Sequence, residues 1–411
     1  MRDREYSAFM LLNAPGFGVR SIHYVFDNLR KAHLKLNDLF DASISQLNDL
    51  LPEVGHGKFS RANVSSLLSL DDDKLYGYYQ KLKKENIHLI SLDDERYPQL
   101  LIERLQENAP PVLFCKGHLT LLNSESVSIV GSRDVSDFGI KVTKRIANRL
   151  AASGYNVASG FAKGVDTNAH IGALENNGTT TMVLSYGFNH LSIKKDIKEF
   201  DWESNTLFIS QFMPYEKFSG QNAMIRNKLV CGLSKAVIVI SSGPERDENG
   251  KMSGTFDAGL TAIKLKIPLF VLSPALLNPT CPKGNIDLIN LGGISLSNGD
   301  GLVKHLESIS TKHIVDVVSN KIESQQVSIQ TLEQPKHNDQ IKPDKIKDKI
   351  LSVFNGKPLS IKDIIEQAQL DWTTQKLTSY LKKVDEIDVV KNGRNNFYKR
   401  KAPQVQTQLF G

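Results

Sequence analysis

Six short apolar runs recur between residues 106 and 308, and helical segments separate them. The runs are 127–130, 156–158, 181–184, 207–209, 236–240 and 269–272. They are continuously apolar, not alternating, which is typical of strands covered by helices on both faces. The pattern predicts an α/β core over 106–318 with a Rossmann-like, doubly wound and mostly parallel sheet. Its ligand is expected at the carboxyl ends of the strands.

The first 105 residues have a different, helical periodicity. Ile22, Val25, Phe26 and Leu29 follow at helical spacing a turn of Pro15-Gly16-Phe17-Gly18. A helix, a Pro-Gly-x-Gly turn and a second helix predict a helix-hairpin-helix or SAM-like domain over 1–105. Such a turn can offer N–H groups to a DNA phosphate, or it is a plain tight connection.

The carboxy-terminal part divides into a linker, a small domain and a tail. Residues 319–343 are rich in Gln, Ser and Lys, which predicts a flexible linker. Residues 344–401 read as three helices followed by a hairpin around Asn392-Gly393, the order of a winged helix. This domain is expected to bind either DNA or a partner protein. Residues 402–411 are a tail.

Two glycine-rich turns follow neighbouring strands of the core. They are Gly131-Ser132-Arg133 and Ser159-Gly160-Phe161-Ala162-Lys163-Gly164, and each precedes a helix. Small residues between a strand and a helix leave backbone N–H groups free at the positive end of the helix dipole. Arg133 and Lys163 add one cation to each turn. The pair predicts a site for a ligand with several phosphates, either a nucleotide or a nucleic-acid backbone.

Charge and composition indicate the kind of ligand and the compartment in which the protein is expected. The 411 residues carry a formal net charge of +6, and residues 344–401 hold 13 Lys and Arg against 8 Asp and Glu, 13 − 8 = +5. Next to a phosphate-binding core, such a surface is consistent with nucleic acid. No apolar run reaches membrane-spanning length, and the first residues lack a signal-peptide core. Three dispersed cysteines, Cys115, Cys231 and Cys281, fit reduced thiols. We therefore expect a cytoplasmic protein.

Signatures of catalysis are weak. The chain has no GxxxxGK[ST] loop, no GxGxxG turn and no HExxH or GxSxG motif. Asp166 and His170 lie four positions apart on one predicted helix, but without a nucleophile they are expected to support the glycine turns. The alternative is a nucleotide-binding or nucleotide-hydrolysing Rossmann-like enzyme or sensor, with Asp257 as the candidate acid. We expect no enzyme, no catalytic residue, no metal and no cofactor.

The order of the motifs resembles one family across nearly the whole chain. Ile129-Val130-Gly131-Ser132-Arg133 is followed by Ser159-Gly160, Asp166 and Ala169-His170, then by Arg226-Asn227, Ser253-Gly254-Thr255 and Gly284-Asn285. Together with the flanking domains, this order is similar to the DNA-processing protein A family (DprA/Smf). The resemblance implies a single-stranded DNA-binding protein of recombination and natural transformation. It also implies a homodimer and a RecA-type recombinase as partner.

The same resemblance assigns the DNA site. It implies phosphate contacts from Gly131, Ser132, Arg133, Ser159, Gly160, Lys163, Gly164, Arg226, Asn227 and Lys228. Secondary contacts are expected on the wing, from Lys391, Arg394, Lys399 and Arg400. Arg133 and Arg226 are expected to be removable without unfolding the protein.

The chain also departs from the family pattern. Ser241-Ser242 replaces an acidic residue, and a polar insertion of residues 243–251 follows it. These differences predict a divergent member, such as one serving a mobile element or a defence system. They leave open whether the pocket still binds DNA or has changed to a nucleotide.

Overall fold

A computed structural model describes residues 3–277, 282–297, 301–308, 350–354, 358–368, 374–381, 384, 386–392 and 395–400. The chain forms two compact units, Met1–Ser319 and Asn320–Gly411. The expected linker 319–343, the tail 402–411, Cys281 and Arg394 lie outside the described residues.

The amino-terminal part of the first unit is helical, as its periodicity predicted. It contains α1 (Arg4–Asn13), α2 (Val19–Lys31), α3 (Asp38–Asp41), α4 (Ile44–Leu50), η1 (Gly57–Phe59), α5 (Val64–Leu68) and α6 (Asp72–Lys84). Gly16 has a φ of +81° in the turn between α1 and α2. A Cβ atom there would collide with the Arg61 carbonyl. The glycine therefore lets this turn pack directly against the backbone at residue 61.

The core is one nine-stranded sheet in the order β1-β2-β6-β5-β4-β3-β7-β8-β9. The strands are β1 (His88–Ser91), β2 (Val112–Gly117), β3 (Ser126–Val130), β4 (Asn156–Gly160), β5 (Thr180–Val183), β6 (Thr206–Ser210), β7 (Ser234–Val239), β8 (Leu269–Leu272) and β9 (Ile294–Leu296). Strands β3 to β9 pair in parallel, while β1 with β2 and β2 with β6 are antiparallel. The six predicted strands are β3 to β8, so the predicted fold class is confirmed.

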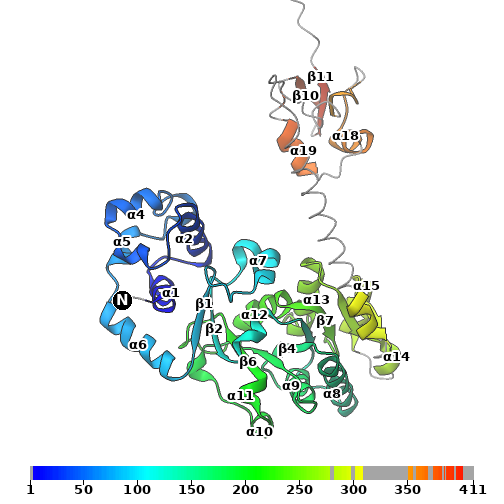
Figure 1. Cartoon of the computed structure of the whole chain (residues 1–411). Helices are drawn as coiled ribbons and strands as arrows, with labels where there is room; N and C mark the ends of the chain where they lie inside the picture. The colour runs from blue at the N-terminus through cyan, green and yellow to red at the C-terminus, as the bar shows by residue number, and fades with distance from the viewer. Residues whose placement is uncertain are drawn as a thin grey trace, which may run out of the picture. The chain divides into compact units, whose positions relative to one another are not determined.

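Helices connect and cover these strands (Figure 1). They are α7 (Gln99–Leu105), η2 (Gln106–Asn108), η3 (Leu119–Asn123), α8 (Asp137–Ala152), α9 (Val165–Leu174), η4 (Phe188–His190), α10 (Lys195–Lys198), α11 (Trp202–Asn205), α12 (Gly220–Gly232), α13 (Gly254–Lys264), α14 (Pro274–Leu277), α15 (Lys283–Asn290) and a helix over 301–308.

Side chains of β3 alternate between two layers of helices. Val127 and Ile129 pack in one core with Ile146 of α8 and Val165 of α9. The hydroxyl of Ser128, between them, donates to the Val230 carbonyl of α12 on the opposite face. This alternation is the pleat of a strand buried on both sides. It explains why continuous apolar runs predicted the sheet.

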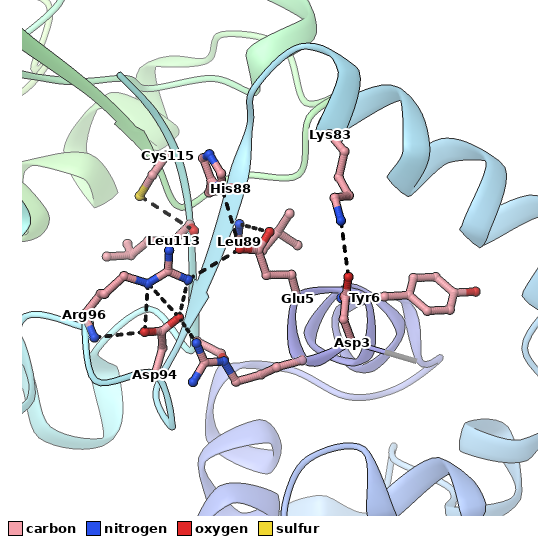
Figure 2. A network of polar contacts seen from close by, with 12 residues as sticks. Asp3, Glu5, Tyr6, Lys83, His88, Leu89, Asp94, Arg96, Leu113 and Cys115 are labelled. Carbon is pink, nitrogen blue, oxygen red and sulfur yellow. Dashed lines mark hydrogen bonds and ion pairs between the residues drawn. The ribbon is translucent and has the colours of Figure 1, made fainter. Parts of the chain in front are cut away.

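A polar network fixes α1 to the β1 edge of the sheet (Figure 2). The Asp94 carboxylate accepts from Arg4 at 2.6 Å and from Arg96 at 2.7 Å. Glu5 of α1 accepts from the Leu89 backbone N–H at 3.3 Å. Burial acts to raise the pKa of Asp94, but the hydrogen bonds from Arg96 prevail and hold it below its usual value. The helical region and the sheet therefore form one packed unit.

The second unit has described helices α18 (Ile361–Gln367) and α19 (Thr374–Leu381) and a hairpin of β10 (Ile387–Asn392) and β11 (Asn395–Arg400). Ser360 caps α18 through a capping box with Asp363. Ile364, Leu377 and Tyr398 share a small apolar core. The full winged-helix arrangement remains a prediction. In the described parts of both units, no helix combines the length and apolarity that crossing a bilayer would require.

Candidate nucleic-acid interface

A pocket of about 730 Å³ opens at the carboxyl ends of β3, β4 and β7. The sheet reverses its strand order here, because β4 pairs with one side of β3 and β7 with the other. This topological switch point is where open α/β sheets bind ligands. The lining comes from the turn after β3, the start of α9, helix α12 and the segment from β7 to α13: Val130, Gly131, Ser132, Arg133, Ala162, Asp166, Phe218, Gly220, Gln221, Ala223, Met224, Arg226, Asn227, Gly243, Pro244, Asp247, Lys251, Met252, Ser253, Gly254, Thr255 and Ala258.

The two predicted glycine turns pack directly against each other. The Val165 backbone N–H donates to the Ser132 carbonyl at 3.2 Å. Gly164 has a φ of +76°, and a Cβ atom there would collide with the Ser132 and Arg133 carbonyls. A Cβ on Gly131 would collide with the Val165 side chain. Glycine at 131 and 164 therefore brings the turns together, which the sequence motif alone did not reveal.

Arg226 is the buried cation of the pocket. The residue is 7% exposed, and its Nη1 lies 3.8 Å from Oδ2 of the buried Asp166. Burial raises the pKa of Asp166, and Arg226 acts in the opposite direction. Burial likewise lowers the pKa of Arg226, while Asp166 opposes the shift. Among the described residues, Nε of Arg226 has no hydrogen-bond partner. The guanidinium is therefore desolvated and incompletely satisfied.

Gly160, the last residue of β4, makes room for this ion pair. A Cβ atom at Gly160 would collide with the Arg226 guanidinium and the Asp166 carboxylate. Its carbonyl accepts a hydrogen bond from Nε2 of His170 at 2.5 Å. The absence of a side chain at Gly160 thus makes room for the Arg226–Asp166 ion pair, and the bond from His170 holds its carbonyl in place.

His170 holds this backbone in place and is not positioned for acid–base chemistry. Its Nδ1 lies 2.7 Å from the Thr180 hydroxyl. Because a carbonyl oxygen can only accept, Nε2 carries the proton of the neutral ring. Burial lowers the pKa of His170 to about 3, so the ring stays neutral at working pH. Asp166 and His170 both lie against Gly160 at the end of β4, and their support of the glycine turns stays a prediction.

Arg133 is an exposed cation of the same pocket. Its guanidinium lies over the Phe218 ring, 5.5 Å from the ring centre. Phe218 is 52% exposed. A cation and an aromatic face at one rim are suited to a phosphate and an unstacked base.

The remaining predicted residues divide between the pocket and its surroundings. Ser132 lines the pocket, and its hydroxyl accepts from the Asp134 backbone N–H. Asn227 also lines it, but its amide donates to the Gly254 carbonyl at 2.9 Å and to Asp257 at 3.0 Å. It therefore joins α12 to the start of α13.

Besides Gly160 and Gly164, three further predicted contacts lie outside the pocket lining. Ser159 is fully buried, and its hydroxyl donates to the Ile129 carbonyl at 2.5 Å. The structure therefore places this hydroxyl inside the sheet and not in the pocket. Lys163 and Lys228 are exposed and lie outside the pocket lining. Lys228 is two positions from Arg226 on α12, so about 200° of helical rotation separates them.

The expected wing contacts belong to the second unit. Lys391 lies in β10, and Lys399 and Arg400 lie in β11. The Lys399 side chain is exposed. Their part in DNA binding stays a prediction.

Lys194 supports the second glycine turn and was missed from the sequence. Its Nζ donates to the Phe161 carbonyl at 3.1 Å, the Ala162 carbonyl at 2.8 Å and the Thr167 hydroxyl at 2.6 Å. The ammonium also lies 4.4 Å from the centre of the Phe161 ring. A lysine 31 residues beyond Lys163 carries no local motif, so only the fold brings it here.

The titration of Lys194 predicts that anion binding at this pocket is sensitive to alkaline pH. Burial lowers its pKa from 10.5 to about 8, with Asp166 and Asp196 opposing this shift and Lys163 adding to it. An anion binds best while the ammonium is charged, so affinity should fall between about pH 7 and about pH 9. Lys194→Met should flatten this profile, whereas Lys195→Met, a change at an exposed neighbour, should retain it. An unchanged profile in Lys194→Met would contradict the assignment.

The same titration affects stability in the opposite direction. Between about pH 8 and 10.5 the folded state binds fewer protons at Lys194 than the unfolded chain does. The contribution of this group to folding therefore rises with pH over that window. A loss of affinity there cannot come from unfolding driven by Lys194.

Other pocket residues lacked a recognisable signal in the sequence. Phe218, Gln221 and Met224 come from the start of α12 and the residues before it, and Asp247 and Lys251 come from the polar insertion. Phe218, an aromatic residue shortly before Arg226-Asn227, is the one signal in the sequence that could have indicated this part of the lining. Among the described residues, no group of three His, Cys, Asp or Glu could hold a metal ion.

Comparison with known proteins agrees with this architecture. The family described as "DNA recombination-mediator protein A" matches residues 88–307. The DNA processing protein DprA of Bacillus subtilis is 25% identical over 268 residues, covering 65% of this chain and 87% of the relative. That of Streptococcus pneumoniae is 34% identical over 171 residues, covering 41% and 58%. Protein Smf of Escherichia coli is 29% identical over 228 residues, covering 55% and 58%.

A solved structure shares the fold. The X-ray structure of DprA from Streptococcus pneumoniae superimposes with a TM-score of 0.59 at 24% identity, covering 74% of this chain and 98% of that one. The matched family region contains the whole sheet and every strand end that forms the pocket. The chain therefore belongs to the DNA recombination-mediator protein A family, as the order of its motifs predicted.

Proposed function

We propose that the protein binds single-stranded DNA through the pocket at the ends of β3, β4 and β7, and that it serves DNA uptake or recombination. The observation that carries this proposal is Arg226, a buried guanidinium that lines the pocket and whose Nη1 lies 3.8 Å from Asp166, farther than a hydrogen bond. A phosphate oxygen is the acceptor that completes such a group. Arg133 at the rim supplies a second, exposed phosphate contact.

The form of the pocket favours one strand over a duplex. The described walls are strand ends, turns and the amino-terminal halves of α12 and α13, a hollow in which one flexible strand can lie. Phe218 offers an exposed ring on which a base can stack. Binding through Arg and Lys releases counterions from the backbone, so affinity should decrease as salt rises.

A non-enzymatic role agrees with the side-chain partners. Asp257, the candidate acid of a nucleotide hydrolase, is outside the pocket lining and accepts a hydrogen bond from Asn227. Asp166 is paired with Arg226 and His170 is held between Thr180 and Gly160. The pocket thus offers contacts for binding and no arranged nucleophile and base.

We further propose that this protein acts in the cytoplasm as a homodimer and delivers its DNA to a RecA-type recombinase. These proposals rest on membership of the family. The basic second unit would add contacts to DNA or to a protein partner.

The test is a titration of the full chain with a single-stranded oligonucleotide, its duplex and free mononucleotides at equal salt. We expect the single strand to bind most tightly. Equal or tighter binding of the duplex would contradict the single-strand proposal. Tighter binding of mononucleotides would favour the nucleotide sensor or hydrolase.

Arg133→Ala should weaken single-strand binding by about 1–3 kcal/mol, the free energy of a lost charge-assisted contact. The salt slope should flatten by about 0.7 for one phosphate. Arg133 is exposed, so the melting temperature should not change. Arg145→Ala, at an exposed position on α8 outside the pocket, is the matched control. Normal binding by Arg133→Ala would show that the rim is elsewhere.

A further inference from the structure

The polar insertion between β7 and α13 folds into a defined finger, residues 245–253. Arg246 and Met252 form an antiparallel bridge. The Ser253 backbone N–H donates to the Glu245 carbonyl at 3.0 Å, and that of Asp247 donates to the Lys251 carbonyl at 3.0 Å. Gly250 completes the turn with a φ of +75°. The finger is therefore held by its own hydrogen bonds.

Asp247 holds the turn of the finger and lines the pocket. Its Oδ1 accepts from the Asn249 N–H at 3.0 Å and from the Lys251 N–H at 2.9 Å. Both bonds use the same oxygen, which leaves Oδ2 available to a ligand. Glu248, the next residue along, is exposed and does not line the pocket.

A carboxylate in this pocket restricts what part of DNA can lie beside it. It repels phosphate, and it can only accept hydrogen bonds. The deoxyribose of an internal nucleotide has no hydroxyl to donate. The donors of a DNA strand are therefore on its bases, and in a single strand their pairing edges are free.

We propose that Asp247 is a specificity-determining residue that accepts a hydrogen bond from the exocyclic amino group of an unpaired base. Cytosine, adenine and guanine carry such a group, whereas the N3–H of thymine is flanked by two carbonyl oxygens that repel a carboxylate. This inference rests on the proposed function, since it concerns the same site. It gives the pocket a base preference that phosphate contacts alone cannot provide.

The test compares oligo-dC with oligo-dT of equal length, at equal salt and slightly alkaline pH. The wild-type full chain should bind oligo-dC more tightly by roughly three- to tenfold, the net effect of one hydrogen bond at an exposed position such as Asp247. Asp247→Asn keeps Oδ1 for the turn and replaces Oδ2 by an amide donor. The ratio of the two affinities should then fall to about one or below, because the amide matches the thymine carbonyls.

Glu248→Gln is the matched control, because it removes one negative charge from the same turn outside the pocket. It should strengthen binding of both oligonucleotides equally and leave their ratio unchanged. A ratio that Asp247→Asn does not alter, or that Glu248→Gln alters as much, would overturn the assignment to Asp247. Failure of the wild-type chain to bind either oligonucleotide would instead overturn the proposed function. Melting curves of both variants confirm that each is folded.

Discussion

Arg226→Ala is expected to abolish most single-strand binding and to destabilise the protein by about 3–5 kcal/mol, the cost of leaving a buried charge without its partner. Asp166 is 4% exposed, so without Arg226 its carboxylate loses its paired cation at 3.8 Å. The sequence alone predicted that Arg226 can be removed without an effect on folding, whereas its burial beside Asp166 predicts a loss of stability. Chemical denaturation and oligonucleotide titration measure the two losses separately.

A second substitution distinguishes the two roles of Arg226. In Arg226→Ala/Asp166→Asn the uncompensated charge is gone, so much of the stability should return while binding remains weak. Lys228→Ala, on the same helix and exposed, should change stability by less than about 0.5 kcal/mol. If Arg226→Ala melts and binds like the parent, the buried pair does not form the site.

Gly160→Ala is expected to have the second-largest effect. The added methyl group would occupy the space of the Arg226 guanidinium and the Asp166 carboxylate. Overpacking of this kind costs about 1–3 kcal/mol of stability. Because the displaced guanidinium no longer faces the pocket, affinity should fall by about 10- to 100-fold, equivalent to about 1.4–2.8 kcal/mol.

Gly77→Ala controls for the change of residue type, since no atom lies near the added Cβ in α6. It should be neutral or slightly stabilising, because alanine favours a helix. Adding Arg226→Ala to Gly160→Ala should cost less affinity than Arg226→Ala costs in the parent, since the guanidinium is already displaced. Fully additive losses would show that Gly160 acts independently of Arg226.

Local patterns were sufficient for the fold and for part of the site. The six continuous apolar runs predicted β3 to β8, because strands covered on both faces leave that pattern. Gly131, Arg133 and Gly164 could be identified from sequence because small residues between a strand and a helix form a tight turn, and this depends only on neighbouring residues. Strand β1 lies outside these six runs, and its antiparallel pairing with β2 at the edge of the sheet depended on long-range packing.

The roles of several site residues could not be inferred in this way. Ser159 belongs to the same glycine-turn motif as Gly160. Its side chain is nevertheless fully buried, and its hydroxyl donates to the Ile129 carbonyl. Lys228 adjoins Arg226-Asn227 in sequence, but helical rotation separates it from the pocket. Lys194 and Asp247 reach the site from other segments, and no spacing rule predicts them.

The sequence by itself determined the strand and helix order, the glycine turns and the family, because these depend on neighbouring residues and on the order of motifs. Only the tertiary structure decided which cation is buried and which is exposed. Arg226 and Arg133 are the same residue type, but one lies against Gly160 and Asp166 while the other lies over Phe218. The burial of each arginine and the identity of its partners depend on packing between segments that are distant in sequence. A local sequence pattern therefore cannot predict how strongly each arginine contributes to stability or to binding.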